Sequence, residues 1–124
     1  MSDCYCGNSL SFENCCAPYI KGIQKPATAE ALMRSRYSAY ATGNADYLIE
    51  TTHLSTRKFH RKSDILAWSK NNQWLKLIVL NATENTVTFE AYFLDENSQA
   101  QVHYEHSAFT LENECWYYVD GEFS

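Results

Sequence analysis

The segment QWLKLIVLNATENTVTFEAYFL, residues 73–94, decides the fold class. Every second residue of 86–94 is apolar until Leu94, and the polar turn TEN separates this run from the largely apolar residues 73–82. A period of two that is interrupted by a short polar turn predicts two antiparallel strands joined as a hairpin. Residues 100–111 and 115–121 follow after further polar turns, so we expect the second half of the chain to form an antiparallel meander.

The first half of the chain shows the helical period instead. Thr28 is the expected N-cap of a helix that ends at Gly43, and Asn44 is the expected cap of the next one. A third, shorter helix is expected after Ser63, and it stops before the strands begin. Because helices come first and strands follow, the predicted class is α+β, with the helices packed on one face of the sheet.

Composition narrows the classes of function. The chain has 124 residues, 45% hydrophobic and 15% aromatic, which predicts one packed domain with room for a small appendage. The formal net charge is -5, and the densest basic stretch is residues 57–62, so nucleic-acid binding is disfavoured. No apolar run approaches the roughly 20 residues that span a bilayer, and the first ten residues lack the features of a signal peptide. We therefore expect a cytoplasmic protein without a membrane segment.

Four of the five cysteines are crowded into CYCGNSLSFENCC, residues 4–16. Four thiolates are the ligands that zinc takes in a closed tetrahedral site, and clustered cysteines in a reducing compartment favour metal over disulfides. The predicted ligands of a structural zinc ion are Cys4, Cys6, Cys15 and Cys16. A vicinal disulfide and a redox-active thiol pair are the alternatives. So short a segment has no core without the ion.

The local sequence has to let adjacent cysteines converge. Cys15 and Cys16 would diverge on a strand, whereas a helical turn separates them by only about 100°. Gly7 frees the backbone to fold the first cysteine arm over the ion, and Pro18 is expected to end the helical turn. The two negative charges of a zinc tetrathiolate need an offset, for which backbone N–H groups and Lys21 are the candidates.

The cysteine segment resembles the SEC-C motif, named for the C-terminal zinc knuckle of the SecA translocation ATPase. LMRSRYSAYATGNADYLIETTH, residues 32–53, with WYYVDG, residues 116–121, resembles the YchJ-like family. This resemblance implies a zinc knuckle at residues 1–22 and a nuclear-transport-factor-two-like domain at 27–124, a cone of helices against a curved antiparallel sheet. It also implies zinc ligation by the same four cysteines, and dimerisation through the open sheet face is common in related cones.

Cones of this kind often enclose a pocket, and the sequence offers candidates for its lining. Arg36, Tyr40 and Trp116 are the predicted ligand-binding residues, and His53 with Asp120 is the candidate acid/base pair. Each has a simpler interpretation: Arg36 covers the core or pairs with an acidic residue, His53 caps a helix, and the aromatic residues pack in the sheet.

The remaining histidines and the last cysteine have simpler predicted roles. His103 and His106 are three residues apart on a strand and must face opposite sides of the sheet. His60 is expected in solvent, and Cys115 is expected to be a buried structural thiol.

The predicted function is a binding module with a structural zinc ion, recognising a protein through the knuckle or a small molecule in the cone. The exposed knuckle residues Tyr5, Leu10 and Phe12 are expected to contact the cone or a partner. The alternative is an enzyme that uses the cone pocket. Convergence of Arg36, His53 and Asp120 in one open cavity would favour the enzyme.

Overall fold

The computed structural model describes residues 3–123, so residues 1–2 and 124, at the ends of the two predicted units, lie outside the described residues. Four antiparallel strands form one sheet in chain order, as the meander predicted. The strands are β1 (Gln73–Ala82), β2 (Thr86–Leu94), β3 (Ala100–Glu112) and β4 (Cys115–Phe123). The bounds of β1 and β2 are those expected from the sequence.

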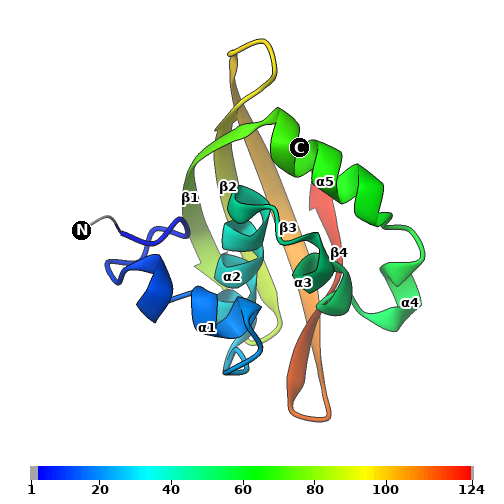
Figure 1. The fold of residues 1–124 in the computed structure, drawn as a ribbon. Coiled ribbons are helices and arrows are strands. Elements are labelled where there is room, and N and C mark those ends of the chain that lie inside the picture. The colour runs from blue at the N-terminus through cyan, green and yellow to red at the C-terminus, as the bar shows by residue number, and fades with distance from the viewer. Residues whose placement is uncertain (1–2, 124) are drawn as a thin grey trace.

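The helices precede the sheet in the chain and cover one of its faces (Figure 1). They are the 3-10 helix η1 (Phe12–Asn14) and the α-helices α1 (Ala17–Ile20), α2 (Ala29–Thr42), α3 (Ala45–Glu50), α4 (Leu54–Arg57) and α5 (Lys62–Asn71). The predicted α+β class is confirmed.

Helix α2 is the central element because it packs on the concave side of the sheet and contacts the N-terminal segment as well (Figure 1). Its ends match the sequence prediction: the Thr28 side chain accepts a hydrogen bond from the Ala31 N–H at 3.0 Å, and Gly43 caps the other end with φ 76°. The left-handed conformation at Gly43 is one that residues with a Cβ rarely adopt.

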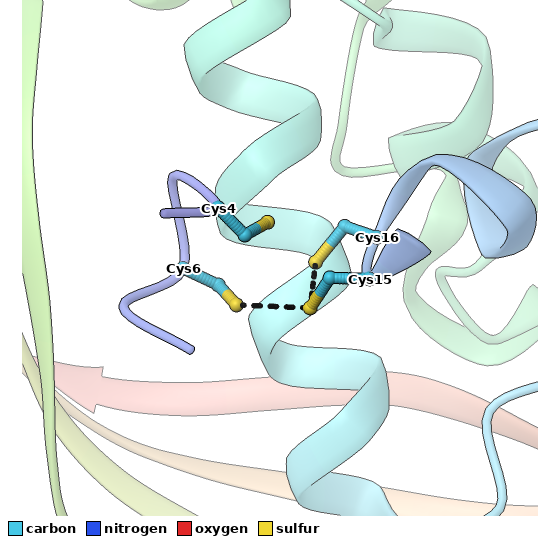
Figure 2. A group of neighbouring side chains, drawn as sticks. All are labelled: Cys4, Cys6, Cys15 and Cys16. Atoms are coloured by element: carbon cyan, nitrogen blue, oxygen red, sulfur yellow. Dashed lines mark hydrogen bonds between the residues drawn. The ribbon is translucent and has the colours of Figure 1, made fainter. Parts of the chain in front are cut away.

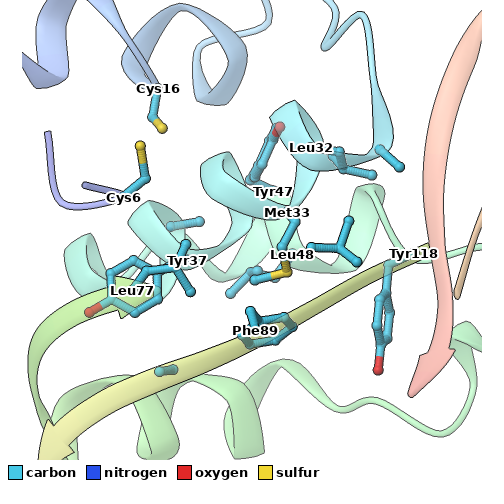
Figure 3. Close-up of a cluster of buried hydrophobic side chains, with 14 of the residues drawn as sticks. Cys6, Cys16, Leu32, Met33, Tyr37, Tyr47, Leu48, Leu77, Phe89 and Tyr118 are labelled. Atoms are coloured by element: carbon cyan, nitrogen blue, oxygen red, sulfur yellow. The ribbon is translucent and has the colours of Figure 1, made fainter. Parts of the chain in front are cut away.

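The hydrophobic core lies between α2 and the inner face of the sheet (Figure 3). Leu32 and Leu48 from the helices and Phe89 from β2 are buried in it, and the buried thiols of Cys6 and Cys16 belong to the same cluster. The N-terminal segment therefore shares a core with the cone. Burial at about 25 cal/mol per Å² of apolar surface makes this shared cluster the main source of stability.

Two local predictions for the helices are wrong. Pro18 lies in the first turn of α1 instead of ending a helical turn. The N–H groups of a first turn have no acceptor within the helix, so a proline, which has no N–H, is tolerated there. Helix α5 begins at Lys62 instead of after Ser63. Helix α4, which has only four residues, was not predicted from the sequence.

A bulge in β4 changes which residues share a face. Tyr118 pairs with Phe109 and Asp120 pairs with Ala108, so Val119 is an extra residue between two paired positions. Because Phe109 and Ala108 are consecutive, they point to opposite faces, and so do their partners. Tyr118 and Asp120 therefore lie on opposite faces, although a regular strand would place residues i and i+2 on the same face.

None of the helices in residues 3–123 has the length and apolar character needed to cross a membrane.

Candidate metal centre and cone cavity

Four cysteine side chains from two short arms meet in front of helix α2 (Figure 2). Cys4 and Cys6 come from the first arm, and Cys15 and Cys16 lie between η1 and α1 in the second. Gly7 has φ 94° and donates its N–H to the Cys4 carbonyl at 3.0 Å, which closes the first arm as predicted. All four Sγ atoms lie within 4.8 Å of one another.

The spacing of the sulfurs fits a tetrahedral ion. Four thiolates at about 2.3 Å from zinc define sulfur–sulfur edges of about 3.8 Å. The Cys6 and Cys15 sulfurs are 3.7 Å apart, and those of Cys15 and Cys16 are 3.9 Å apart. All five cysteines are free thiols. Sulfur donors without oxygen donors are the set that thiophilic cations prefer, so this cluster can hold a metal ion.

The thiols do not ionise alike. Hydrogen bonding from Cys16 lowers the pKa of Cys6 to about 5, against the opposing effect of burial. Burial raises the pKa of Cys15 to about 11, and the hydrogen bond to Cys6 together with burial raises the pKa of Cys16. The cluster thus accepts a first negative charge readily and resists further ones unless a cation offsets them.

Arg34 connects the first cysteine arm to helix α2. Its Nη1 donates to the Cys6 carbonyl at 2.7 Å, and its Nε donates to the Glu30 carboxylate at 2.9 Å. Lys21, predicted from the sequence to offset the charge of the site, is instead exposed at the end of α1. The cation that contacts the cysteine arm is Arg34, which comes from a helix that lies outside the motif.

Two further polar side chains contact the sulfurs. The Ser38 hydroxyl lies 3.5 Å from the Cys4 Sγ, and the Asn8 amide donates to the Cys15 Sγ at 3.4 Å. Such contacts orient metal ligands and partly neutralise their charge. Ser38 is completely buried on α2, so the cluster is built jointly by the knuckle and the cone.

A cavity of about 230 Å³ lies within the cone, on the inner side of the sheet. Its wall is mostly aromatic and includes Trp68 from α5, Trp74 from β1 and Phe89 from β2. The lining residues that carry polar groups are Arg36, Tyr37, Tyr40, His60, His103, Glu105 and Tyr118. A mostly apolar cavity with a few convergent polar groups is the usual form of a small-molecule site.

Glu105 is the buried anion of this cavity. Its Oε1 lies 2.9 Å from His103 Nε2, and its Oε2 accepts hydrogen bonds from the Ser107 hydroxyl and, at 2.9 Å, from the Tyr118 hydroxyl. Burial raises the pKa of Glu105, but the hydrogen bonds from these three side chains outweigh burial and hold the pKa below its ordinary value. Glycine at 121 leaves space for the carboxylate, since a Cβ there would lie 2.1 Å from Oε2.

Arg36 is the buried cation of the cavity. Its Nη1 donates to the Leu48 carbonyl at 3.0 Å and to the Thr51 hydroxyl at 2.7 Å, and its Cζ lies 4.5 Å from the centre of the Tyr118 ring. Arg36 is only 5% exposed, yet within residues 3–123 it forms no ion pair with a carboxylate. Buried charges are normally paired, so this guanidinium is unusual.

The chain is similar to known proteins over most of its length. Residues 28–121 match the family described as YchJ, middle NTF2-like domain. A UPF0225 protein of Serratia proteamaculans is 42% identical over 125 residues, covering 95% of this chain and 81% of that protein. The chain belongs to the YchJ family. A second UPF0225 relative, from Photorhabdus laumondii, is 43% identical over 95% of this chain and 79% of its own length.

Solved structures agree with the YchJ assignment. The solution structure of a SEC-C motif containing protein from Rhodopseudomonas palustris matches with a TM-score of 0.90 and 35% identity, covering 98% of both chains. The crystal structure of a SEC-C motif containing protein from Psychrobacter arcticus matches with a TM-score of 0.79 and 26% identity, covering 100% of this chain and 84% of that one. The likeness to SEC-C motif proteins extends over the knuckle as well as the cone.

The structure places only some of the predicted pocket residues of this YchJ chain in the cavity. Arg36 and Tyr40, one helical turn apart on α2, both line it. Trp116 does not, because its Nε1 donates to the Ala27 carbonyl at 3.3 Å beside the linker. His60 lies in the cavity lining and packs edge-on against Tyr118, so the expectation that His60 is solvated is wrong.

The candidate pair His53 and Asp120 is not brought together. His53 caps α4, its Nδ1 accepting the Ser55 N–H, and its Nε2 lies 2.5 Å from the Glu112 carboxylate. Asp120 is exposed on the other face of β4 because of the bulge. Neither residue lines the cavity, so the arrangement that would have favoured the enzyme alternative is absent from the described residues.

Glu105 was not among the predicted site residues, although the period of the strand points to it. Glu105 is two residues from His103 on β3, and residues i and i+2 of a strand share a face. His103 faces the cavity and His106 is exposed, as the strand period predicted.

Replacing Arg34 by methionine is expected to weaken metal binding by about tenfold, because residues that support metal ligands typically contribute that much. Methionine keeps much of the length of the side chain but loses the hydrogen bond to Cys6. Competition with a chromophoric chelator on reduced protein measures the affinity. The exposed Arg61, replaced in the same way, is the matched control, and equal affinities for the two variants would contradict the role of Arg34.

The depressed pKa of Glu105 predicts a pH dependence of stability. A carboxyl group whose pKa is lower in the folded state stabilises above the unfolded value, here 4.5, and loses this contribution as the pH falls through the folded value. We expect the free energy of unfolding of the wild type to exceed that of Glu105→Gln by about 2 kcal/mol near neutral pH. Below pH 4.5 this difference should be smaller. Urea unfolding of both proteins across this range is the test, and a gap that grows toward acid would contradict it.

Proposed function

We propose that this YchJ-family protein is a cytoplasmic binding module in which a structural zinc ion, held by Cys4, Cys6, Cys15 and Cys16, fixes the N-terminal knuckle on the cone. The observation that carries the proposal is the group of four Sγ atoms within 4.8 Å of one another. Zinc bound there would crosslink two arms that have little core of their own. A reducing compartment keeps the thiols available as ligands.

A structural role for the ion is supported by the burial of the site. Cys4, Cys6 and Cys16 are buried, and four protein sulfurs complete the coordination of a tetrahedral ion. Catalytic zinc sites instead keep one position for water or substrate. The ion would act through the fold, by holding the knuckle against α2.

Native mass spectrometry of freshly reduced protein tests this proposal. We expect one zinc ion per chain, and we expect EDTA treatment to expose the knuckle to proteolysis between residues 4 and 16. The same spectrum reports whether the chain forms the homodimer that its resemblance to other cones suggests. Metal-free protein that keeps its knuckle protected would overturn the structural zinc ion.

The binding role rests on the cone cavity. Its Tyr, Trp and Phe wall supplies apolar contact area, and Arg36 supplies a charge that no carboxylate of the described chain neutralises. A ligand of matching shape and charge would bind in this cavity, and binding alone requires no catalytic group. The rival enzyme would need an acid or base other than His53 and Asp120, since neither lines the cavity.

A second candidate is a protein partner at the knuckle. Tyr5 is 49% exposed and Leu10 is 57% exposed, and the Tyr5 ring packs edge-on against Phe12, which is half-buried. Exposed aromatic and aliphatic side chains beside a rigid site suit a docking surface. Tagged wild-type protein and a Tyr5→Ser/Leu10→Ser variant, purified from the same cells, should differ in one specific partner. Identical partners would contradict this candidate.

A further inference from the structure

The polar groups of the cone cavity divide into a satisfied set and an unsatisfied set. Glu105 already accepts hydrogen bonds from three side chains, so its charge is offset within the protein. Arg36 is different, because within the described chain only its Nη1 donates to protein acceptors. The buried Tyr37 hydroxyl, which also lines the cavity, has no hydrogen-bond partner among residues 3–123. The Tyr40 hydroxyl and the His60 ring likewise form no side-chain hydrogen bond with another described residue.

The unsatisfied groups can all act as donors. The pKa of Tyr40 is raised, chiefly by burial, so the phenol keeps its proton. The pKa of His60 is lowered by burial and by Arg36, so the imidazole is neutral and carries one N–H. A guanidinium, a phenol and a neutral imidazole that line one cavity are complementary to a small anion.

The rest of the cavity determines the shape of the ligand. Trp68, Trp74 and Phe89 form an aromatic wall, on which a planar ring can stack or pack edge-on. An apolar cavity of about 150 Å³ already accommodates benzene. A cavity of about 230 Å³ therefore suits one ring with a small substituent.

We propose that the cone cavity binds a small aromatic carboxylate, with the carboxylate at Arg36, Tyr40 and His60 and the ring against Trp68, Trp74 and Phe89. This inference deepens the proposed binding role and rests on it. Glu105, which accepts a hydrogen bond from the Tyr118 hydroxyl and also lines the cavity, disfavours a second negative charge there. The site therefore selects ligands with one carboxylate.

Three compounds of nearly equal shape test the charge preference: benzoate, benzamide and benzamidine, which are anionic, neutral and cationic. Isothermal titration calorimetry on the zinc-loaded protein should show benzoate binding at least about tenfold more tightly than benzamide, since charge-assisted hydrogen bonds are about twice as strong as neutral ones. Benzamidine should not bind. Equal binding of benzoate and benzamide, tighter binding of benzamidine, or no binding by any of the three overturns the proposal.

Three variants, one of them a control, test the position of the site without altering Arg36, which also donates hydrogen bonds to Leu48 and Thr51. Ala91 lines the cavity, so Ala91→Leu should abolish benzoate binding by filling it. Ala108 lies on the opposite face of the sheet, and Ala108→Leu is the matched control that should bind normally. Tyr40→Phe keeps the ring but removes one donor and should weaken benzoate binding about threefold to tenfold. Unchanged binding by Ala91→Leu overturns the site.

Zinc measured on the same samples separates this inference from the wider proposal. If folded, zinc-loaded protein binds none of the three compounds, the proposed aromatic carboxylate ligand is overturned and the proposed structural zinc ion is not. If the protein contains no zinc but binds benzoate, the proposed structural zinc ion is overturned and the proposed aromatic carboxylate ligand is not.

Discussion

Cys6→Ser is expected to lower the free energy of unfolding by about 4 kcal/mol, the contribution of a ligand present at a thousandfold its dissociation constant. Cys6 is fully buried, and its sulfur lies 3.7 Å from that of Cys15. Serine retains the size of the side chain but is a poor ligand for zinc. The loss should appear in urea unfolding of the reduced protein, together with loss of bound zinc.

The fifth cysteine supplies the control for this experiment. Cys115 is a half-buried thiol at the start of β4, outside the cluster. Cys115→Ser should change stability by about 1 kcal/mol or less and leave the zinc content unchanged. Equal losses in the two variants would mean that Cys6 contributes by packing alone. Adding EDTA should bring the wild type to the stability of Cys6→Ser while leaving the variant almost unchanged.

Gly121→Ala is expected to destabilise the protein by about 3 kcal/mol, because the methyl group would displace a buried and fully hydrogen-bonded carboxylate. A Cβ at this position would lie 2.1 Å from Glu105 Oε2 and 2.8 Å from its Cγ. The Glu105 side chain would have to move and would lose the hydrogen bonds from His103, Ser107 and Tyr118. Thermal or urea unfolding measures the effect.

A double-mutant cycle identifies the cause of this loss. In a Glu105→Ala background the obstacle is gone, so Gly121→Ala should then be neutral or slightly stabilising, as alanine normally is relative to glycine in a strand. The two changes should therefore be strongly non-additive. A cost of Gly121→Ala that is the same in both backgrounds would show that the Glu105 carboxylate does not cause it.

Much of the fold could be predicted because it follows from local rules. The bounds of β1 and β2 come from alternation and turn residues, and the ends of α2 come from the capping groups Thr28 and Gly43. The metal cluster could be proposed because its ligands lie within 13 residues of one another, so few backbone paths have to be imagined. Each of these features depends only on residues that lie close together in the sequence.

The cavity was harder to predict because its lining comes from distant segments. His60 is placed in the cavity after the four-residue helix α4, and Asp120 is turned away from it by a single extra residue in β4. A bulge of one residue reverses every later side chain, and the hydrophobic pattern does not reveal it. Arg34 lies 28 residues from Cys6 in the sequence, and only the packing of α2 against the cysteine arm brings its side chain to the Cys6 carbonyl.

The sequence by itself determined the α+β class, the order of helices and strands, and the cluster of four thiols, because propensity, period and short-range spacing act over a few residues. Only the tertiary structure decided that the thiol cluster is buried against α2, that Arg36 and Glu105 share one cavity, and that His53 and Asp120 stay apart. The physical reason is that a period specifies which side chains share a face, whereas packing decides what that face meets.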